Sequence, residues 1–215
     1  MSGISLIFPH ADNPWNNECL ALKRRMLVEN TRGPYQLLYV SGSTKEDVYP
    51  TWNWLAARAK YDIILWDNSD LVYAPGWDEP IQRHINEADW LCLRSVECGV
   101  IGVASSNIDR NFGRTPASFD RPAFEAFCVE DAEARTEIEP GLFGWYSPSA
   151  FRRQWFLDQG GFDCDLYPPF PFPVDIKFRE KVTARGCRFA IVGSYAYHFQ
   201  LARENAGERD FSPTR

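Results

Sequence analysis

Apolar residues in the first third of the chain fall into short continuous runs separated by longer amphipathic segments. The runs at 4–9, 36–40 and 62–66 have the length and continuity of parallel strands that are buried on both faces. The segments at 16–30 and 51–59 carry apolar residues at the spacing of an amphipathic helix. Strands that alternate with helices predict an α/β fold, in which a mostly parallel, Rossmann-like sheet has helices on both faces.

Residues that start and stop helices refine this pattern. Thr44, followed by acidic residues, signals a helix start, and we expect Pro50 to interrupt that helix so that 51–59 forms a separate one. Residues 106–139 have no regular period, and we expect irregular structure with short pieces there. The same criteria predict helices at 78–88, 149–157 and 175–185, the last ended by Gly186, and strands at 100–105 and 187–192.

Composition and charge narrow the class of protein. The 215 residues suit one domain, and a formal net charge of -6 without a Lys/Arg run argues against nucleic acid or an anionic membrane surface as partner. The six cysteines form no CxxC pair and have no His at zinc-site spacing, which predicts free thiols. The apolar run at 4–8 is too short for a signal peptide or membrane span, so the predicted location is cytoplasmic.

An acidic cluster directly follows the third predicted strand. It contains Asp67, Asn68, Ser69 and Asp70. Ligands of parallel α/β sheets bind at the carboxyl ends of the strands, where this cluster is expected. Carboxylates gathered there repel one another unless a cation is present, and a hard divalent cation binds oxygen ligands. The alternative is a polar turn that leads into the next helix.

The spacing around this cluster resembles the DxD region of glycosyltransferases with the GT-A fold, especially the inverting glycosyltransferase family 2. Asn53 precedes Ala59 by six residues, Asn68 follows Ala59 by nine, and Asp70 closes the triplet before Pro-Gly-Trp at 75–77. Later segments resemble further family motifs in the same order: 140–145 (PGLFGW), 160–163 (GGFD), 175–179 (DIKFR), 185–189 (RGCRF) and 197–198 (YH). The resemblance covers roughly residues 4–199.

The resemblance implies a single catalytic domain over 1–200, with a nucleotide-sugar half at 1–105 and an acceptor half at 106–200. Residues 201–215 then form a polar tail or a linker, and further domains of a longer chain stay open. The implied reaction transfers a sugar, a hexose by preference, from a nucleotide-sugar to a glycan or glycoprotein acceptor. A UDP-sugar and Mn²⁺ or Mg²⁺ are the implied donor and metal.

The resemblance also assigns roles to residues. Asp70 and His198 become metal ligands, although a sheet-end histidine bonded to backbone is the alternative for His198. Asp67 stands where the family has an apolar residue, so its role is open. The donor contacts expected are Pro9, Asn53, Asp67, Asn68 and Arg179. The Asp with which the family pairs uracil at the end of the second strand is missing here, and Ser41, Asp12 and Asn13 are the polar residues offered in its place.

The position of the catalytic base departs from the family. An inverting transfer needs a carboxylate near the acceptor hydroxyl. The family's Glu-Asp pair falls on Phe172 and Pro173, which cannot remove a proton. Asp175 is the nearest acid and is either the base or a helix cap, with Asp163 and Asp165 as fallbacks. A retaining mechanism or an inactive domain is the consequence if none of the three serves.

Two other functions share this fold logic. A nucleotidyltransferase that forms nucleotide-sugars needs a Gly-rich loop with Lys or Arg after the first strand, and 10–14 has neither. A non-catalytic sugar-binding module agrees with the missing Glu-Asp pair.

The proline-rich segment 167–173 is expected to form a stiff wall over the acceptor site. The alternative is that it binds a partner domain as a proline-rich ligand.

Overall fold

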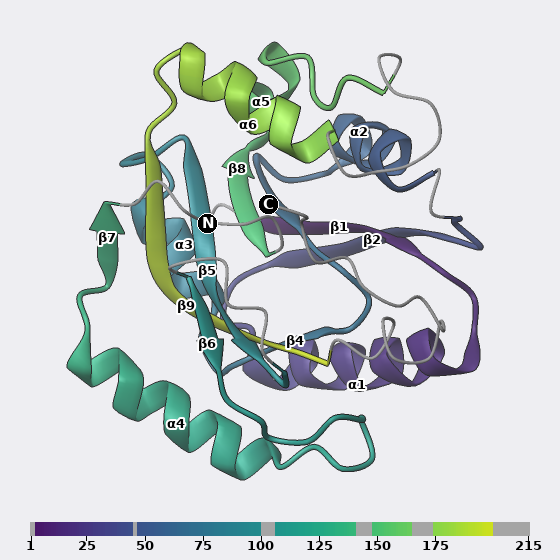
Figure 1. Cartoon of the computed structure of the whole chain (residues 1–215), viewed down its shortest axis with the longest axis vertical. Coiled ribbons are helices and arrows are strands. Elements are labelled where there is room, and N and C mark those ends of the chain that lie inside the picture. Colours follow the sequence, from purple (N-terminus) through teal and green to yellow (C-terminus); the bar gives the residue numbers. More distant parts are fainter. Residues whose placement is uncertain (1–2, 45–46, 100–105, 141–147, 165–173, 200–215) are drawn as a thin grey trace, which may run out of the picture.

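The computed structural model describes residues 3–44, 47–99, 106–140, 148–164 and 174–199, which form a nine-stranded sheet with helices on both faces (Figure 1). The strands are β1 (Ile4–His10), β2 (Tyr35–Ser41), β3 (Ile63–Trp66), β4 (Leu71–Tyr73), β5 (Trp90–Glu97), β6 (Asn107–Asp109), β7 (Ile138–Pro140), β8 (Ser149–Arg152) and β9 (Phe189–His198). The helices are α1 (Pro14–Asn30), α2 (Val48–Arg58), α3 (Asp78–His84), α4 (Arg121–Ala134), α5 (Arg153–Asp158) and α6 (Val174–Ala184). None of these described helices is both long enough and apolar enough to span a bilayer.

The direction of the strands decides where a site can form. The sheet order is β2-β1-β3-β8-β5-β9-β4, with β6 paired to β5 and β7 to β9. β1 is parallel to β2 and β3, and β5 is parallel to β9. β8 lies between β3 and β5 and is antiparallel to both, so β3 and β5 run in the same direction. The five strands that share this direction are therefore β1, β2, β3, β5 and β9. Their carboxyl ends meet at one edge, and the predicted mostly parallel α/β fold is confirmed.

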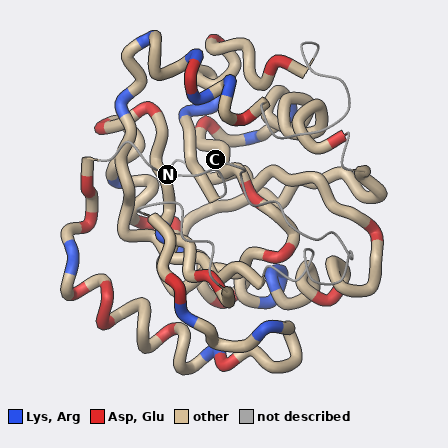
Figure 2. The backbone as a smooth tube through the Cα atoms, in the orientation of Figure 1, with Lys and Arg blue, Asp and Glu red and all other residues tan. Residues whose placement is uncertain are grey.

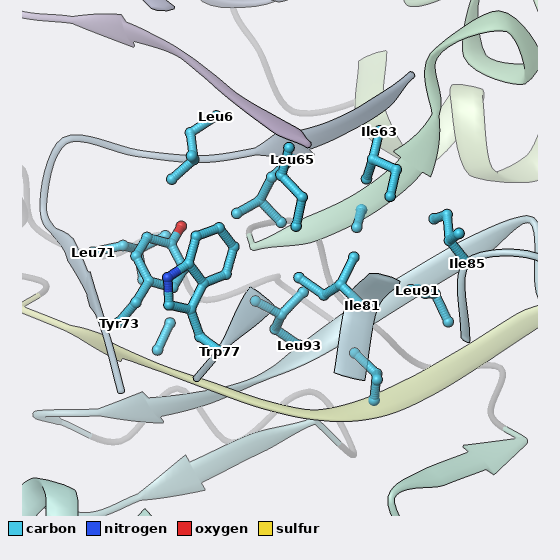
Figure 3. Packing of buried hydrophobic residues seen from close by; sticks show 14 of the residues in the cluster. Leu6, Ile63, Leu65, Leu71, Tyr73, Trp77, Ile81, Ile85, Leu91 and Leu93 are labelled. Carbon is cyan, nitrogen blue, oxygen red and sulfur yellow. The ribbon is translucent and has the colours of Figure 1, made fainter. Parts of the chain in front are cut away.

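The helices cover both faces of the sheet, as predicted. α2, α5 and α6 pack on one face, and α1 and α3 pack on the other (Figure 1). On the α1/α3 face, Leu6, Leu65 and Leu93 of the sheet meet Trp77 and Ile81 (Figure 3). Complete burial of such a side chain stabilises the fold by about 1.5–3 kcal/mol. The two cores therefore hold the strand ends in a rigid frame.

The α2 helix continues through Pro50, so the predicted interruption is wrong. Pro50 is the third residue of the helix, where a backbone N–H has no partner within the helix. A proline there removes no hydrogen bond and its fixed φ suits the first turn. The turn closes normally, because the Thr51 amide donates to the Asp47 carbonyl at 2.8 Å.

The segment 106–139, expected to be irregular, contains the 14-residue helix α4. Asp120 caps its N-terminus by accepting a backbone hydrogen bond at 3.1 Å, and Pro122 lies in the first turn. Phe124 and Phe127 bury one face of the helix in a cluster shared with α1 and β9. These start signals and the spacing of three are present in the sequence.

Two neighbouring strands also correct the predictions. Residues 149–152 form β8, and only the second half of the predicted helix at 149–157 is helical, as α5. β5 was not predicted, because Arg94, Ser95 and Glu97 interrupt its apolar run although all eight residues are buried. Both strands pair with segments distant in sequence, which supply the backbone partners that local patterns do not show.

The C-terminal elements are close to the predicted ones. α6 is followed by Gly186 with φ of 79°, which confirms both the helix and its stop. β9 extends to His198, beyond the predicted 187–192, and α3 ends at His84 rather than near residue 88. All six cysteines carry free thiols. The predicted features at 100–105, 141–145, Asp165, 167–173 and 201–215 lie outside the described residues.

Candidate functional site

Three polar side chains meet at the carboxyl edge of the sheet. β9 lies between β5 and β4, and its register places His198 beside Glu97 on one side and Leu71 on the other. Asp70 directly precedes Leu71, and its Oδ2 lies 3.3 Å from Nε2 of His198. Nδ1 of His198 is hydrogen-bonded to Oε2 of Glu97 at 2.8 Å. The structure therefore brings together the two predicted metal ligands, Asp70 and His198.

Glu97 is the residue of this group that sequence reasoning missed. It is buried, and its second oxygen accepts a hydrogen bond from Ser95 at 2.6 Å. A carboxylate that holds the far nitrogen of an imidazole fixes the orientation of the ring and leaves Nε2 free to bind a cation. The signal in the sequence is an acidic residue, Glu97, at the end of the mostly apolar segment 90–97, but this segment was not predicted as a strand.

The charges at this edge are strongly coupled. Burial alone disfavours the imidazolium, but Asp70 and Glu97 outweigh it and raise the pKa of His198 to about 10. Burial also opposes ionisation of Asp70, yet the charge and hydrogen bond of His198 hold the pKa of Asp70 below its usual value. Two carboxylates around one imidazole stabilise the protonated ring, and a metal ion bound at Nε2 would take the place of that proton.

The donor set has two ligands from the protein. Among the described residues, no three His, Cys, Asp or Glu side chains gather in an arrangement that could hold a metal ion by themselves. Asp70 and His198 supply one oxygen and one nitrogen, which suits Mn²⁺ and leaves positions for diphosphate oxygens and water. The chemistry of the pair fits a divalent cation shared with a substrate.

Asp67 and Asn68 both contact Lys23 of α1. Asp67 is fully buried, and its Oδ2 lies 2.6 Å from Nζ of Lys23. Its Oδ1 accepts hydrogen bonds from the Tyr73 hydroxyl at 2.6 Å and from the Asn68 amide at 2.8 Å. Both carboxylate oxygens of Asp67, a predicted donor contact, thus already have partners inside the protein. Lys23 was not singled out in the sequence.

The predicted donor contacts after β1 serve local structure. Asn13 caps α1 by accepting a hydrogen bond from the Asn16 amide at 2.9 Å. Asp12 accepts a hydrogen bond from Asn17 at 2.9 Å. Ser41 ends β2 and is exposed beside β1, while Pro9 is partly buried in β1. These side chains line the same edge as Asp70, because β1, β2 and β3 run parallel.

Asn53 forms a bridge between α2 and the Gly-Gly-Phe turn. Its Nδ2 donates to the Phe162 carbonyl at 2.8 Å, and its Oδ1 accepts from the Phe162 amide at 2.9 Å. Gly161 has φ of +60°, and a Cβ there would lie 2.4 Å from Oδ1 of Asn53. The turn therefore requires glycine, and the structure gives Asn53 a role in holding it.

The predicted base residues lie on or before α6, on the face that α2 and α5 also cover. Asp175 is partly buried, and burial raises its pKa to about 6 despite hydrogen bonds from the Ile176 amide and Tyr49. Arg179, one turn later, opposes this shift by its charge. Asp163 is exposed. The pKa of Asp175 places its carboxylate near the range that a general base needs at neutral pH.

A cavity of about 610 Å³ lies elsewhere, between α3, α4 and the middle of β9. Its wall includes Trp77, Val129 and Tyr195 but none of the predicted site residues. Acidic and basic side chains are interspersed along the described backbone rather than gathered in a basic band (Figure 2). We place the candidate site at the sheet edge, because the coupled carboxylates and histidine are there.

Comparison with solved structures identifies the fold. GalNAc-T7 with UDP, GalNAc and Mn²⁺ matches over 92% of this chain and 44% of its own, with a TM-score of 0.65 and 12% identity. S. aureus TarS 1-349 in complex with UDP matches over 92% and 60%, with a TM-score of 0.59 and 11% identity. The chain has the GT-A fold. The complex of TarS with UDP-GlcNAc gives a TM-score of 0.58 at 11% identity, over 92% and 58% of the two chains.

The chain spans about half of each neighbour's length. No protein-family model and no curated protein matches its sequence. The fold expected from the order of motifs is confirmed at the level of the structure.

Proposed function

We propose that this chain is a metal-dependent glycosyltransferase that takes its sugar from a nucleotide-sugar, with a UDP-sugar as the first donor to test. The observation that carries the proposal is the Asp70–His198 pair, 3.3 Å apart at the carboxyl edge and oriented by Glu97. The neighbours solved with UDP, UDP-GlcNAc and Mn²⁺ support the donor class.

Asp70 and His198 would hold the divalent cation. When bound, the cation supplies stabilisation of the negative charge that grows on the departing nucleoside diphosphate. Glu97 keeps the imidazole ring turned so that Nε2 faces Asp70. The burial of Asp70 and Glu97 limits the competition of water for their charges.

Asp175 is the proposed base of an inverting transfer to a glycan or glycoprotein acceptor. Its carboxylate would accept the proton of the acceptor hydroxyl as the new glycosidic bond forms. The pKa of about 6 leaves the group mostly ionised at neutral pH and still basic enough to take that proton. Asp163 and Asp165 stay the second choices for this role, and Arg179 is a proposed donor contact.

The decisive experiment measures Mn²⁺-dependent binding of UDP by calorimetry. Asp70→Ala should abolish the binding while the protein stays folded, because His198 keeps its ion pair with Glu97. Asp89→Ala is the matched control, since Asp89 pairs with Arg188 at the opposite end of β5. Unchanged binding by the Asp70 variant would contradict the metal assignment.

Turnover separates the classes of function. UDP-, GDP- and dTDP-sugars should be hydrolysed or transferred at different rates, and only with Mn²⁺ or Mg²⁺. Formation of a nucleotide-sugar from a sugar phosphate and a nucleoside triphosphate would instead identify a nucleotidyltransferase. Sugar binding without any turnover would identify a non-catalytic module.

A further inference from the structure

A buried lysine lies directly beneath the segment that carries Asp70. Lys23 of α1 and Asp67 are both completely buried, and their charged atoms are 2.6 Å apart. The Lys23 ammonium also donates to the carbonyl of Asn68 and lies 4.5 Å from the centre of the Phe8 ring. The Lys23 side chain thus contacts two consecutive residues, Asp67 and Asn68, of the segment that carries the predicted metal ligand Asp70.

Asp67 extends this contact to the next strand. Tyr73 of β4 donates to its Oδ1 at 2.6 Å, and the Asn68 amide donates to the same oxygen at 2.8 Å. A second link from α1 runs through Asn16, whose Oδ1 accepts a hydrogen bond from Ser69 at 3.0 Å. The segment between β3 and β4 is therefore tied to α1 and to β4 on both sides of Asp70.

Stability alone does not explain this pair. Taking two charges out of water costs about as much as their attraction returns, so apolar residues often replace a buried ion pair without loss of stability. A role of this charged pair in function, rather than in stability, would explain why it is there.

We propose that Lys23 and Asp67 are positioning residues of the donor site, which hold the Asn68–Asp70 segment in place for the cation and the donor diphosphate. The inference rests on the proposed function of that site. An outer residue that orients a metal ligand typically changes metal affinity by about 10- to 100-fold when it is replaced.

The test uses a double variant that removes both charges together. Lys23→Met/Asp67→Asn leaves no buried charge unpaired, and the amide oxygen can still accept from Tyr73. Its melting temperature should stay near that of the wild type, while its affinity for UDP with Mn²⁺ should fall by about 10- to 100-fold. Lys23→Met/Asp67→Leu should show the same loss.

Arg94 and Glu139 provide the matched control. Arg94 is buried in β5 and its Nη2 lies 2.7 Å from Glu139, but Arg94 and Glu97 point to opposite faces of the strand. Arg94→Met/Glu139→Gln should leave the affinity for UDP with Mn²⁺ unchanged. A stably folded Lys23/Asp67 variant with wild-type affinity would overturn the inference.

The two proposals fail in different ways. If Asp70→Ala loses UDP binding and the Lys23/Asp67 variants keep it, only the positioning role is wrong. If the wild-type protein does not bind UDP with Mn²⁺, the donor site is wrong and the positioning role falls with it. Hydrogen exchange of the wild type adds a test that needs no variant, because the amides of Asp67 and Asn68, which donate to the Ile7 carbonyl and to Oδ1 of Asp67, should exchange as slowly as those of β3. Fast exchange there would overturn the positioning role even if every variant failed to fold.

Discussion

The carboxyl edge of the sheet and the start of α6 hold the two groups of carboxylates on which the proposed reaction depends. At the sheet edge, Asp67, Asp70 and Glu97 each have an ionic partner in the protein, and all three are buried. On the α6 side, Asp163 is exposed and Asp175 is only partly buried.

The difference follows from what each region would have to bind. A cation and a diphosphate carry concentrated charge, so their ligands gain from being fixed in place before binding. A neutral acceptor hydroxyl needs one carboxylate with a suitable pKa, and burial of Asp175 is sufficient to raise it. Substitutions in the two regions should therefore differ in their effects, because the donor edge is fixed and the acceptor side is sparse.

The largest expected effect is on stability, at the donor edge. Lys23→Met leaves Asp67 as a buried carboxylate without its cation, and removal of one partner of a buried pair costs about 3–5 kcal/mol. Urea denaturation measures this loss. Lys177→Met removes one partner of an exposed pair with Glu180 and should cost less than about 1 kcal/mol. Equal losses would show that the donor edge is no more fixed than the surface.

On the acceptor side, Asp175→Asn should lower transfer by roughly 100-fold or more without changing melting or donor affinity. The side-chain oxygen of the new Asn can still accept the hydrogen bond from the backbone N–H of Ile176. A purely capping role therefore predicts near-normal transfer. Steady-state rates at saturating donor distinguish the two. Near-normal transfer would move the base assignment to Asp163 or Asp165.

Asn53 tests whether a predicted donor contact is structural instead. Asn53→Ala leaves the amide and carbonyl of Phe162 without their hydrogen bonds, which should cost about 2 kcal/mol of stability. UDP affinity at a temperature where the variant is folded should stay unchanged. A loss of affinity with unchanged stability would restore Asn53 as a donor contact.

The pH dependence of transfer should report Asp175. The ionised form is the active base, so the rate should fall about tenfold per pH unit below pH 6. The raised pKa in the folded state means that protonation of Asp175 favours folding as pH falls, so this loss is not caused by unfolding through this group. The acid limb should be absent from the residual activity of Asp175→Asn, and its persistence there would assign it to another residue.

The smallest effect concerns the start of α1. Asn13→Ala should cost about 1 kcal/mol through loss of the helix cap, whereas Asn13→Asp should be close to neutral. Thermal melting measures both. A change in UDP affinity in either variant, with melting unchanged, would show that Asn13 contacts the donor.

Local sequence patterns were sufficient to predict the α/β class, the first three strands, and the polar cluster with Asp70 after β3. These features depend on local patterns: a continuous apolar run, a polar cluster directly after it, and glycine or proline at the element ends. α4 belongs with them, because Asp120, Pro122 and the phenylalanine spacing were there to be read. The order of motifs carried the GT-A resemblance in the same way.

Which charged side chains are buried, and which residues pair with them, could be seen only in the folded structure. Lys23 and Asp67 are 44 residues apart in the chain, and Glu97 and His198 are 101 apart. β5 and β8 likewise exist because distant strands satisfy their backbone groups, although polar residues interrupt the apolar run of β5 and the residues of β8 suggest a helix. A charged residue can be buried only beside a partner, and that partner comes from wherever the fold brings the chain back.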